Sequence, residues 1–147
     1  MSELQTSLKF LRAMASKEIY ADPKTTKVAI CTSGGIVPGM NVVIRSIVKC
    51  LEQEYGVQHI LGARFGFYGL ESSQDSDWIT LTAESLGGVQ DQGGSILGGG
   101  KYRPDFGKIV ENLQARGITQ LYFIGGYGTM KGMTKLKSEL RSRGLNI

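Results

Sequence analysis

Short apolar runs that end in glycine and lead into a helical pattern are the feature that most constrains this chain. Val28–Cys31 is followed by a glycine-containing turn at 32–39 and then by a helical pattern. The apolar residues of that helix fall on one face: Val43, Ile44, Ile47, Val48 and Leu51. Leu121–Ile124 reads as a buried strand and leads through the turn 125–128 into a second helix over 130–143. This repeated order predicts an α/β fold around a parallel sheet.

The rest of the pattern adds elements of the same kinds. Strands are predicted at about 57–64 and 78–81, and a helix over 104–114. Gly66 and Gly69 interrupt the segment that joins the two strands. We therefore expect a Rossmann-like parallel sheet with helices on both faces.

The chain divides into two predicted parts. Leucine and methionine recur at helical spacing between residues 3 and 18, so residues 1–24 are predicted to form an N-terminal helical extension that ends at Asp22-Pro23. Residues 25–147 form the α/β portion. The last residues, 143–147, resemble a helix end followed by the start of a further strand, so we expect the sequence to be cut short.

Composition and charge exclude several classes of protein. Glycine supplies 21 of 147 residues in clusters between apolar runs, which excludes a collagen repeat or a flexible linker. The net charge of +4 includes no run of five basic residues, so no arm for nucleic acid is indicated. No membrane span or secretory segment is recognised. Cys31 and Cys50 are too few for a disulfide framework and are expected to be buried thiols in a cytoplasmic protein.

Three glycine-rich turns occupy residues 33–39, 93–100 and 125–128. In a parallel sheet such turns gather at the carboxyl ends of the strands, where ligands bind. Glycine allows backbone N–H groups to converge on an anion, and a helix N-terminus adds a favourable dipole. Lys101 and Arg103 lie beside the second turn. Together these features predict a ligand that carries phosphate.

Other motifs for phosphate or catalysis do not fit. The Walker A pattern fails because Ser95 stands where its first glycine should be and Tyr102 follows Lys101. The turn 125–128 is one residue too long for the dinucleotide fingerprint, so an NAD-binding module is a remote alternative. His59 is the only histidine and has no nearby acidic partner, so a place on a strand surface is expected.

At its glycine motifs the chain resembles the phosphofructokinases. Residues 32–41 look like the nucleotide-binding opening of that family, and Arg64–Leu70 is similar to its Gly-Phe-x-Gly-Leu turn. Residues 93–98 resemble its Gly-Gly-[Ser/Thr]-x-Leu-Gly segment, and Gly125–Thr129 resembles its Gly-Gly-Asp-Gly-Thr. The resemblance runs in order from about residue 20 to 147. Over residues 55–62, the sequence is most similar to the ATP-dependent branch of the family found in plants and trypanosomatids.

The resemblance implies an activity and a set of binding residues. It implies an incomplete phosphofructokinase fold, phosphoryl transfer from ATP to fructose 6-phosphate with Mg²⁺ in glycolysis, and a homo-oligomer when the chain is full length. The implied nucleotide-binding positions are Gly34, Lys101, Tyr102, Gly126, Tyr127, Gly128 and Thr129. Gly128 indicates ATP as the donor, because the family's pyrophosphate users carry Asp at the matching position.

Three departures from the family pattern affect the expected chemistry. Tyr127 occupies the position of the family's metal-binding Asp, and a neutral phenol is a poor ligand for Mg²⁺, so no metal ligand is assigned. Lys101 replaces an Arg and keeps its charge without the forked geometry. The family's catalytic Thr-Ile-Asp-Asn-Asp segment lies beyond Ile147, so no catalytic residue is assigned.

Two interpretations stay open at the level of sequence. In the first, the chain is the N-terminal part of an ATP-dependent 6-phosphofructokinase whose activity resides in the complete polypeptide. In the second, it is a non-catalytic relative that binds nucleotide or a partner subunit. A downstream Thr-Ile-Asp-Asn-Asp segment would separate the two. For these 147 residues acting alone, we predict no kinase activity.

Overall fold

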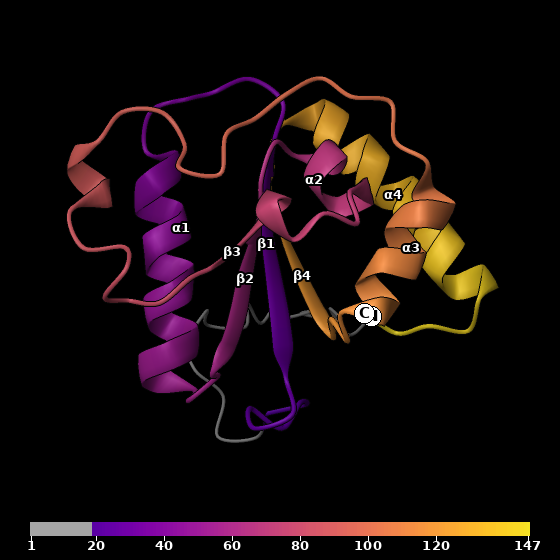
Figure 1. The fold of residues 1–147 in the computed structure, drawn as a ribbon, viewed down its shortest axis with the longest axis horizontal. Helices are drawn as coiled ribbons and strands as arrows, with labels where there is room; N and C mark the ends of the chain where they lie inside the picture. Colours follow the sequence, from indigo (N-terminus) through magenta and orange to yellow (C-terminus); the bar gives the residue numbers. More distant parts are fainter. Residues whose placement is uncertain (1–18) are drawn as a thin grey trace, which may run out of the picture.

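A four-stranded sheet lies between helices in the computed structural model, which describes residues 19–147 (Figure 1). The sheet has the order β3-β2-β1-β4. Its strands are β1 (Lys27–Ser33), β2 (His59–Ala63), β3 (Trp78–Thr80) and β4 (Gln120–Gly125). The predicted α/β fold is confirmed. The helix predicted between residues 3 and 18 lies outside the described residues.

The expectation of a wholly parallel sheet is wrong at β3. β1 pairs in parallel with β2 and β4, whereas β3 pairs antiparallel with β2. The chain between β2 and β3 holds only the short helix α2 (Phe67–Glu71) and the 3₁₀ turn η2 (Asp75–Asp77). This connection stays at the carboxyl end of β2, so β3 starts there and runs back, since a parallel strand needs a longer crossover.

Helix α2 lies where two glycines predicted a break in structure. Gly66 precedes the helix with φ 70°, a left-handed conformation that favours glycine. Gly69 lies inside the helix, where a Cβ atom would overlap the carbonyl oxygen of Arg64. Both glycines therefore allow a tight turn into a short helix packed on the sheet, instead of ending regular structure.

Alternate residues of β1 face two separate cores. Val28 and Ile30 belong to the core with α1 (Met40–Lys49), and Ala29 and Cys31 belong to the core with α3 (Phe106–Ala115) and α4 (Tyr127–Ser142). All four strand residues are fully buried. Figure 1 shows α1 on one side of the sheet and α2, α3 and α4 on the other, so the prediction of helices on both faces is confirmed.

The helix boundaries follow most of the sequence signals. α1 continues into the π-helical turn η1 (Cys50–Glu54), and Gly56 follows at φ 74° as the sequence predicted for a helix end. The Asp105 carboxylate caps α3 by accepting hydrogen bonds from Gly107 N at 3.0 Å and Lys108 N at 3.3 Å. Val43 is an exception: it was predicted on the buried face of α1 and is 44% exposed.

Strand β4 lies at one edge of the described sheet. It pairs with β1 alone, so Leu121–Ile124 are half-buried and the expectation of a fully buried strand is wrong. α4 begins at Tyr127, before its predicted start at Met130. Residues 145–147 are irregular where the start of a strand was predicted, and Leu145 and Ile147 pack against the core that includes α3 and α4.

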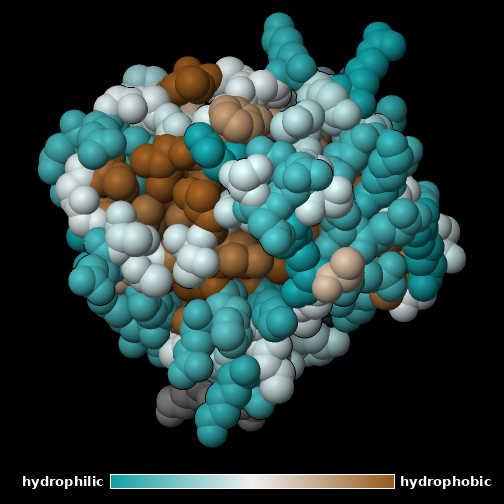
Figure 2. All heavy atoms as spheres, in the orientation of Figure 1, coloured by the Kyte–Doolittle hydropathy of each residue, from teal (hydrophilic) through white to brown (hydrophobic). Residues whose placement is uncertain are grey.

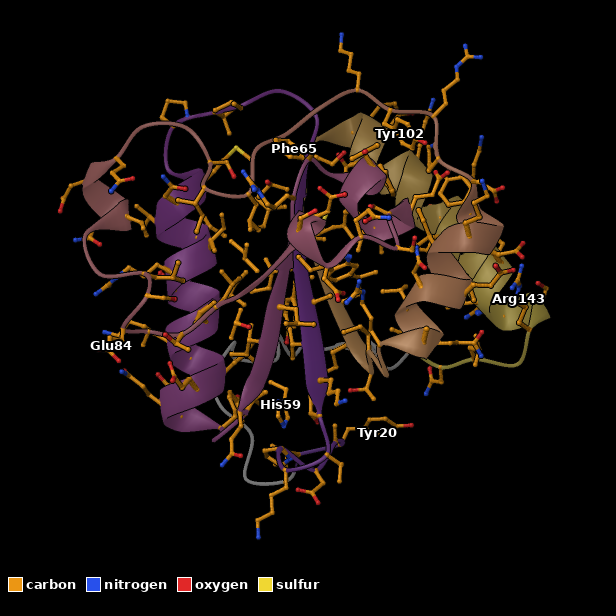
Figure 3. The ribbon with its side chains drawn as sticks, in the orientation of Figure 1. Tyr20, His59, Phe65, Glu84, Tyr102 and Arg143 are labelled. Carbon is orange, nitrogen blue, oxygen red and sulfur yellow. The ribbon has the colours of Figure 1, made fainter. Side chains whose placement is uncertain are left out.

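The two cysteines and the histidine differ in their exposure: Cys31 is buried, Cys50 is half-buried and His59 is exposed. Cys31 is buried as predicted, and its burial raises the pKa of the thiol. Cys50 is only half-buried, against prediction; desolvation and the Glu54 carboxylate, to which its Sγ donates at 3.7 Å, raise its pKa. His59 is exposed and lies at the opposite end of the sheet from Phe65 and Tyr102 (Figure 3).

The face drawn in Figure 2 is mostly hydrophilic, with hydrophobic side chains gathered in one area of it. Several large apolar side chains near the first two glycine turns are exposed: Ile36, Val37, Val42, Val43 and Phe65. Within residues 19–147, no helix is long and apolar enough to cross a membrane.

Candidate functional site

A cleft of about 440 Å³ forms where the three glycine-rich turns meet. Its lining comes from the end of β1 and the turn after it, from α2, from the segment that precedes α3 and from the start of α4: Ser33, Gly34, Gly35, Phe67, Gly100, Lys101, Tyr102, Gly126, Gly128 and Thr129. All the predicted binding positions except Tyr127 are therefore brought together. Their role in binding stays a prediction.

The topology of the sheet explains the place of this cleft. β1 and β4 are parallel neighbours, and Ser33 pairs with Gly125 at their carboxyl ends. The chain leaves β1 toward α1 on one face and leaves β4 toward α4 on the other. Neighbouring strands whose connections part to opposite faces leave a crevice between the two turns, which is the usual ligand site of an open α/β sheet.

The turn after β1 is held against the other two turns. Gly34 has φ 90°, and its N–H donates to the carbonyl oxygen of Gly100 at 3.4 Å. A Cβ atom at residue 34 would lie 3.7 Å from Thr129 Oγ1. Gly34 thus adopts a left-handed backbone conformation, which favours glycine, at the point where the three turns contact one another.

The loop 93–100 is fixed by polar side chains beneath it. Asn41 is 2% exposed; its Nδ2 donates to Gln92 O at 3.0 Å and its Oδ1 accepts from Ile96 N at 2.8 Å. The Thr32 hydroxyl donates to the carbonyl oxygen of Gly98 and lies 3.0 Å from Ser95 Oγ. These bonds satisfy buried backbone groups that the loop could not satisfy itself.

The turn after β4 is shaped by close packing at its first residue. A Cβ atom on Gly125 would overlap Thr129 Oγ1 and lie 2.6 Å from the Ser33 carbonyl oxygen. The Thr129 hydroxyl donates to that same oxygen at 3.2 Å. Gly126 and Gly128, by contrast, have nothing within 4 Å of a Cβ position, so their backbone is open to a ligand. The N–H groups of this first helical turn lack intrahelical acceptors and suit an anion.

Aromatic side chains border the cleft beside the second turn. The Tyr102 ring is 41% exposed and meets Tyr68 edge-to-face with 5.6 Å between centroids. Desolvation and then the nearby Glu71 carboxylate raise the pKa of Tyr102. Phe67 is buried and packs on Phe123 with centroids 4.9 Å apart. This corner combines a flat apolar surface with the ammonium of Lys101.

Tyr127 does not line the cleft. It is the first residue of α4 and its side chain is 73% exposed. Lys131, one turn further along the helix, places its Nζ 4.6 Å from the centroid of the Tyr127 ring, within the range of a cation–π contact. The side chain at the metal-ligand position of the family pattern thus contacts a cation of its own chain.

The residues present do not fit a protein-bound Mg²⁺. That ion prefers small anionic oxygen ligands in octahedral geometry. No acidic residue lies in the first turn of α4, and no Asp, Glu or His lines the cleft. Over residues 19–147, no group of three metal-ligating side chains gathers anywhere. Among the described residues, no carboxylate lines the cleft to coordinate a divalent cation.

Sequence reasoning assigned no role to two contributors to the cleft and its support: Phe67 and Asn41. A signal for Asn41 existed, because it is a polar residue among the apolar positions Met40, Ile44 and Val48 of α1. An amide on a buried helix face is expected to bind backbone groups of a neighbouring loop. Phe67 is the aromatic residue of the Gly-Phe-x-Gly-Leu turn, but its place in the cleft depends on how α2 folds back over β1.

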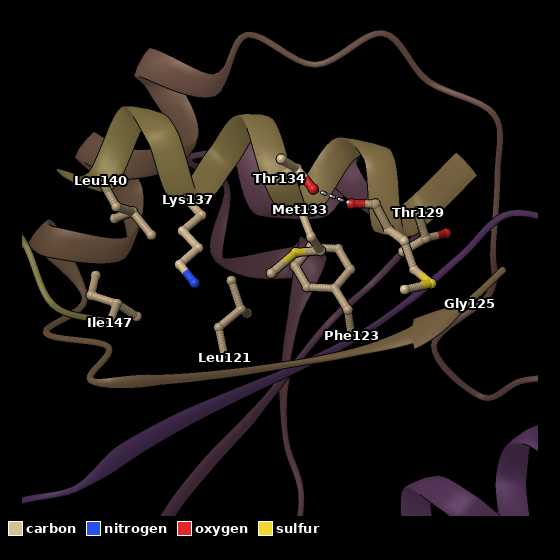
Figure 4. A pocket seen from close by; sticks show the side chains of 10 residues that line it. Leu121, Phe123, Gly125, Thr129, Met133, Thr134, Lys137, Leu140 and Ile147 are labelled. Carbon is tan, nitrogen blue, oxygen red and sulfur yellow. Dashed lines mark hydrogen bonds between the residues drawn. The ribbon is translucent and has the colours of Figure 1, made fainter. Parts of the chain in front are cut away.

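A second cavity of about 480 Å³ lies between β4 and α4 (Figure 4). Leu121, Phe123, Met133, Leu140 and Ile147 are among its lining residues, with Lys137 reaching over it from α4. This cavity is mainly apolar and has no glycine turn that opens backbone N–H groups to a ligand, apart from Gly125 at one end. The cleft at the three turns is therefore the better candidate for an anionic ligand.

Comparison with known proteins gives a family for this arrangement. The model of the family described as Phosphofructokinase matches residues 27–147. ATP-dependent 6-phosphofructokinase 4, chloroplastic, of Arabidopsis thaliana is 40% identical over 138 residues, which are 94% of this chain and 26% of that protein. The ATP-dependent 6-phosphofructokinase of Trypanosoma cruzi is 35% identical over 149 residues, covering 99% of this chain and 31% of the relative.

Solved structures share the fold at lower identity. Pichia pastoris phosphofructokinase in the T-state aligns with TM-score 0.71 and 24% identity over 88% of this chain and 15% of that chain. A pyrophosphate-dependent phosphofructokinase from Marinobacter aquaeolei aligns with TM-score 0.71 and 15% identity over 83% of this chain and 31% of that chain. The chain spans about a quarter to a third of the curated relatives named above. From its glycine turns, its sheet and these matches, the chain belongs to the phosphofructokinase family.

Proposed function

We propose that this chain is the nucleotide-binding portion of an ATP-dependent 6-phosphofructokinase. In the complete polypeptide, the γ-phosphoryl group of ATP is transferred to fructose 6-phosphate in glycolysis. The observation that carries the proposal is the meeting of three glycine turns in one cleft at the switch point between β1 and β4. Gly34, Gly126 and Gly128 admit phosphate close to the backbone there, and Thr129 holds two of the turns together.

ATP suits the cleft better than pyrophosphate as the donor. The open space at Gly128 leaves room for a bulky ligand, and the half-exposed Tyr102 at the cleft offers aromatic surface for a base. Lys101 supplies a charge for phosphate. The names of the Arabidopsis and Trypanosoma relatives describe ATP-dependent enzymes, which supports the same choice.

The chain alone binds nucleotide without turning it over. A kinase needs a group that accepts the proton of the attacking hydroxyl, and no Asp, Glu or His lines the described cleft. The alternative of a non-catalytic relative rests on the same observation. The two differ in the complete polypeptide, where only the enzyme supplies the missing acidic segment.

The test combines binding with turnover. Calorimetry is expected to show ATP binding to the 147-residue chain, with pyrophosphate and NAD weaker, while a coupled assay with ATP, MgCl₂ and fructose 6-phosphate shows no product. Gly128→Asp is expected to weaken ATP binding about tenfold or more by crowding and repulsion. Lys135→Asp, which places a carboxylate on the exposed outer part of α4, is the matched control.

Each outcome separates the interpretations. Failure of the wild-type chain to bind ATP, or preferential binding of NAD, would overturn the proposal. Turnover by the chain alone would show that a base exists within it. Activity of a continued polypeptide favours the enzyme over the non-catalytic relative.

We also propose a localisation, a domain division and an assembly for the full-length protein. We propose that the protein is cytoplasmic; because the Arabidopsis relative is named as chloroplastic, a plastid is the other compartment to test. We also keep residues 1–24 as an extension separate from 25–147, and a homo-oligomer for the full-length protein. Imaging of a tagged full-length chain and sedimentation would check compartment and assembly.

A further inference from the structure

The cavity between β4 and α4 has the size of a small-molecule site. Its volume of about 480 Å³ lies within the range of such sites. The lining follows β4 from Leu121 to Gly125 and α4 from Thr129 to Leu140 (Figure 4). At a rise of about 1.5 Å per residue, the α4 wall is roughly 16 Å long, so the cavity has room for an extended ligand. It shares only Thr129 with the lining of the nucleotide cleft.

Most of the cavity wall is apolar. Leu121 and Phe123 contribute from β4, Met133 and Leu140 from α4, and Ile147 from the segment after α4. All five belong to, or pack against, the core between the sheet and the helices α3 and α4. A ligand that fills the cavity is therefore held mainly by the removal of its own apolar surface from water.

The hydroxyl groups of the lining already have partners within the protein. The Thr134 hydroxyl donates to Met130 O at 3.1 Å, and the Thr129 hydroxyl donates to Ser33 O at 3.2 Å. Lys137 forms none of the salt bridges found within residues 19–147. Its ammonium is thus the polar group of the lining that is left to meet an anionic ligand.

Lys137 supplies a positive charge beside the apolar wall. Figure 4 shows its side chain extending from α4 toward β4. No acidic side chain of the described residues lines the cavity. The stem of a lysine lies favourably on apolar surface, whereas its ammonium needs water or an anion. The charge of Lys137 is therefore not balanced by the rest of the lining.

We propose that this cavity binds an aliphatic carboxylate, with its tail on the apolar side chains of β4 and α4 and its head on the Lys137 ammonium. Charge complementarity selects the head, because a carboxylate gains a charge-assisted hydrogen bond where a cation would be repelled. A polyphosphate suits the cavity less well, because the apolar wall has no donors to replace the water that its charges lose. The ligand thus differs from a nucleotide, and its binding does not depend on the proposed function.

A series of ligands separates the tail from the head. Octanoate, decanoate, decanol and acetate are titrated into the 147-residue chain by calorimetry, below the concentrations at which they form micelles. We expect decanoate to bind about tenfold more tightly than octanoate, because each buried methylene group strengthens binding about threefold to fourfold. Decanol is expected to bind about fivefold more weakly than decanoate because it lacks the ion pair. Acetate, which has no tail, is expected not to bind.

The variant Lys137→Gln tests the contact with the head. We expect it to raise the dissociation constant of decanoate about fivefold and to leave that of decanol near the wild-type value, because only the carboxylate uses the charge. Lys135→Gln is the matched control. Lys135 is also exposed on α4 but does not line the cavity, so the affinities for both ligands should stay unchanged.

Methionine methyl resonances locate the bound ligand. Met130 and Met133 line the cavity, whereas Met40 is buried in α1 on the opposite side of the sheet. We expect decanoate to shift the resonances of Met130 and Met133 and to leave that of Met40 unchanged. Saturating ATP is expected not to displace the decanoate.

Contrary outcomes overturn the assignment at separate points. Equal affinity for octanoate and decanoate would show that the apolar wall does not hold the tail, and equal losses in Lys137→Gln and Lys135→Gln would show that Lys137 does not hold the head. Shifts at Met40 without shifts at Met133, or displacement by ATP, would place the carboxylate elsewhere. A dimer in sedimentation that binds no decanoate would assign this face to a second copy of the chain. Failure of ATP to bind, by contrast, would refute the nucleotide site and leave the carboxylate site standing.

Discussion

The loop 93–100 and the turn 125–129 both line the cleft, yet their backbones are held in different ways. The loop depends on polar side chains from other elements, chiefly Asn41 and Thr32. The turn depends on the absence of a side chain at Gly125, which lets Thr129 and the Ser33 carbonyl oxygen come close. The comparison teaches that a glycine-rich turn lining a cleft can be fixed either by hydrogen bonds from other elements or by close steric packing.

The largest effect on stability is expected at Gly125, where close steric packing fixes the turn. Gly125→Ala places a methyl group 2.6 Å from the Ser33 carbonyl oxygen and against the Thr129 hydroxyl, and neither neighbour can move without shifting β1 or α4. We expect a loss of about 3 kcal/mol in the free energy of unfolding, the upper part of the range for overpacking. Urea denaturation followed by circular dichroism measures it.

Gly126→Ala is the matched control for that substitution. Residue 126 has nothing within 4 Å of its Cβ position, so we expect a change within about 1 kcal/mol, of the size that a less favourable helix cap costs. Similar losses at residues 125 and 126 would show that the turn tolerates no side chain for reasons of backbone conformation, and the steric explanation would be wrong.

A smaller effect on stability is expected at Asn41, whose hydrogen bonds fix the loop 93–100. Asn41→Ala leaves the carbonyl of Gln92 and the N–H of Ile96 without their partner, which we expect to cost about 2 kcal/mol. Hydrogen exchange at the Ile96 amide is expected to accelerate. Gln92→Ala keeps the same backbone acceptor and changes only an exposed side chain, so stability and exchange should stay near wild type. An Ile96 amide that remains protected in Asn41→Ala would contradict this account of the loop.

The same contrast explains what the sequence could predict. Gly125 and its neighbours are recognisable because a glycine turn between a strand and a helix is a local pattern. The supports of the loop are not local: Asn41 lies 55 residues before its partner Ile96. Tyr127 was predicted within the turn, whereas α4 begins at this residue and leaves its side chain 73% exposed. The sequence thus identified the glycine turn, and tertiary contacts decided where the helix begins.

The direction of the antiparallel strand β3 is a second feature that the local sequence could not predict. The residues Trp78–Thr80 were predicted as a strand, and the pattern of apolar residues in three positions cannot give a direction. Direction follows from the compact connection through α2, whose glycines looked like interruptions in the sequence. By contrast, helices on both faces of β1 could be predicted, because a run such as Val28–Cys31 without polar residues must be covered on both sides.

The smallest effect on stability is expected at Thr129, which links the two regions. It lies on the turn 125–129, and its hydroxyl donates to β1, the strand whose Thr32 also supports the loop 93–100. Thr129→Val removes this bond to the Ser33 carbonyl oxygen at a site only 5% exposed, and we expect about 1 kcal/mol of destabilisation. Thr134→Val is the matched control: its hydroxyl also donates to a backbone oxygen of α4, but at an exposed position where water replaces it. Thermal denaturation of both variants is the measurement. Equal effects would mean that the buried bond contributes no more to stability than an exposed one.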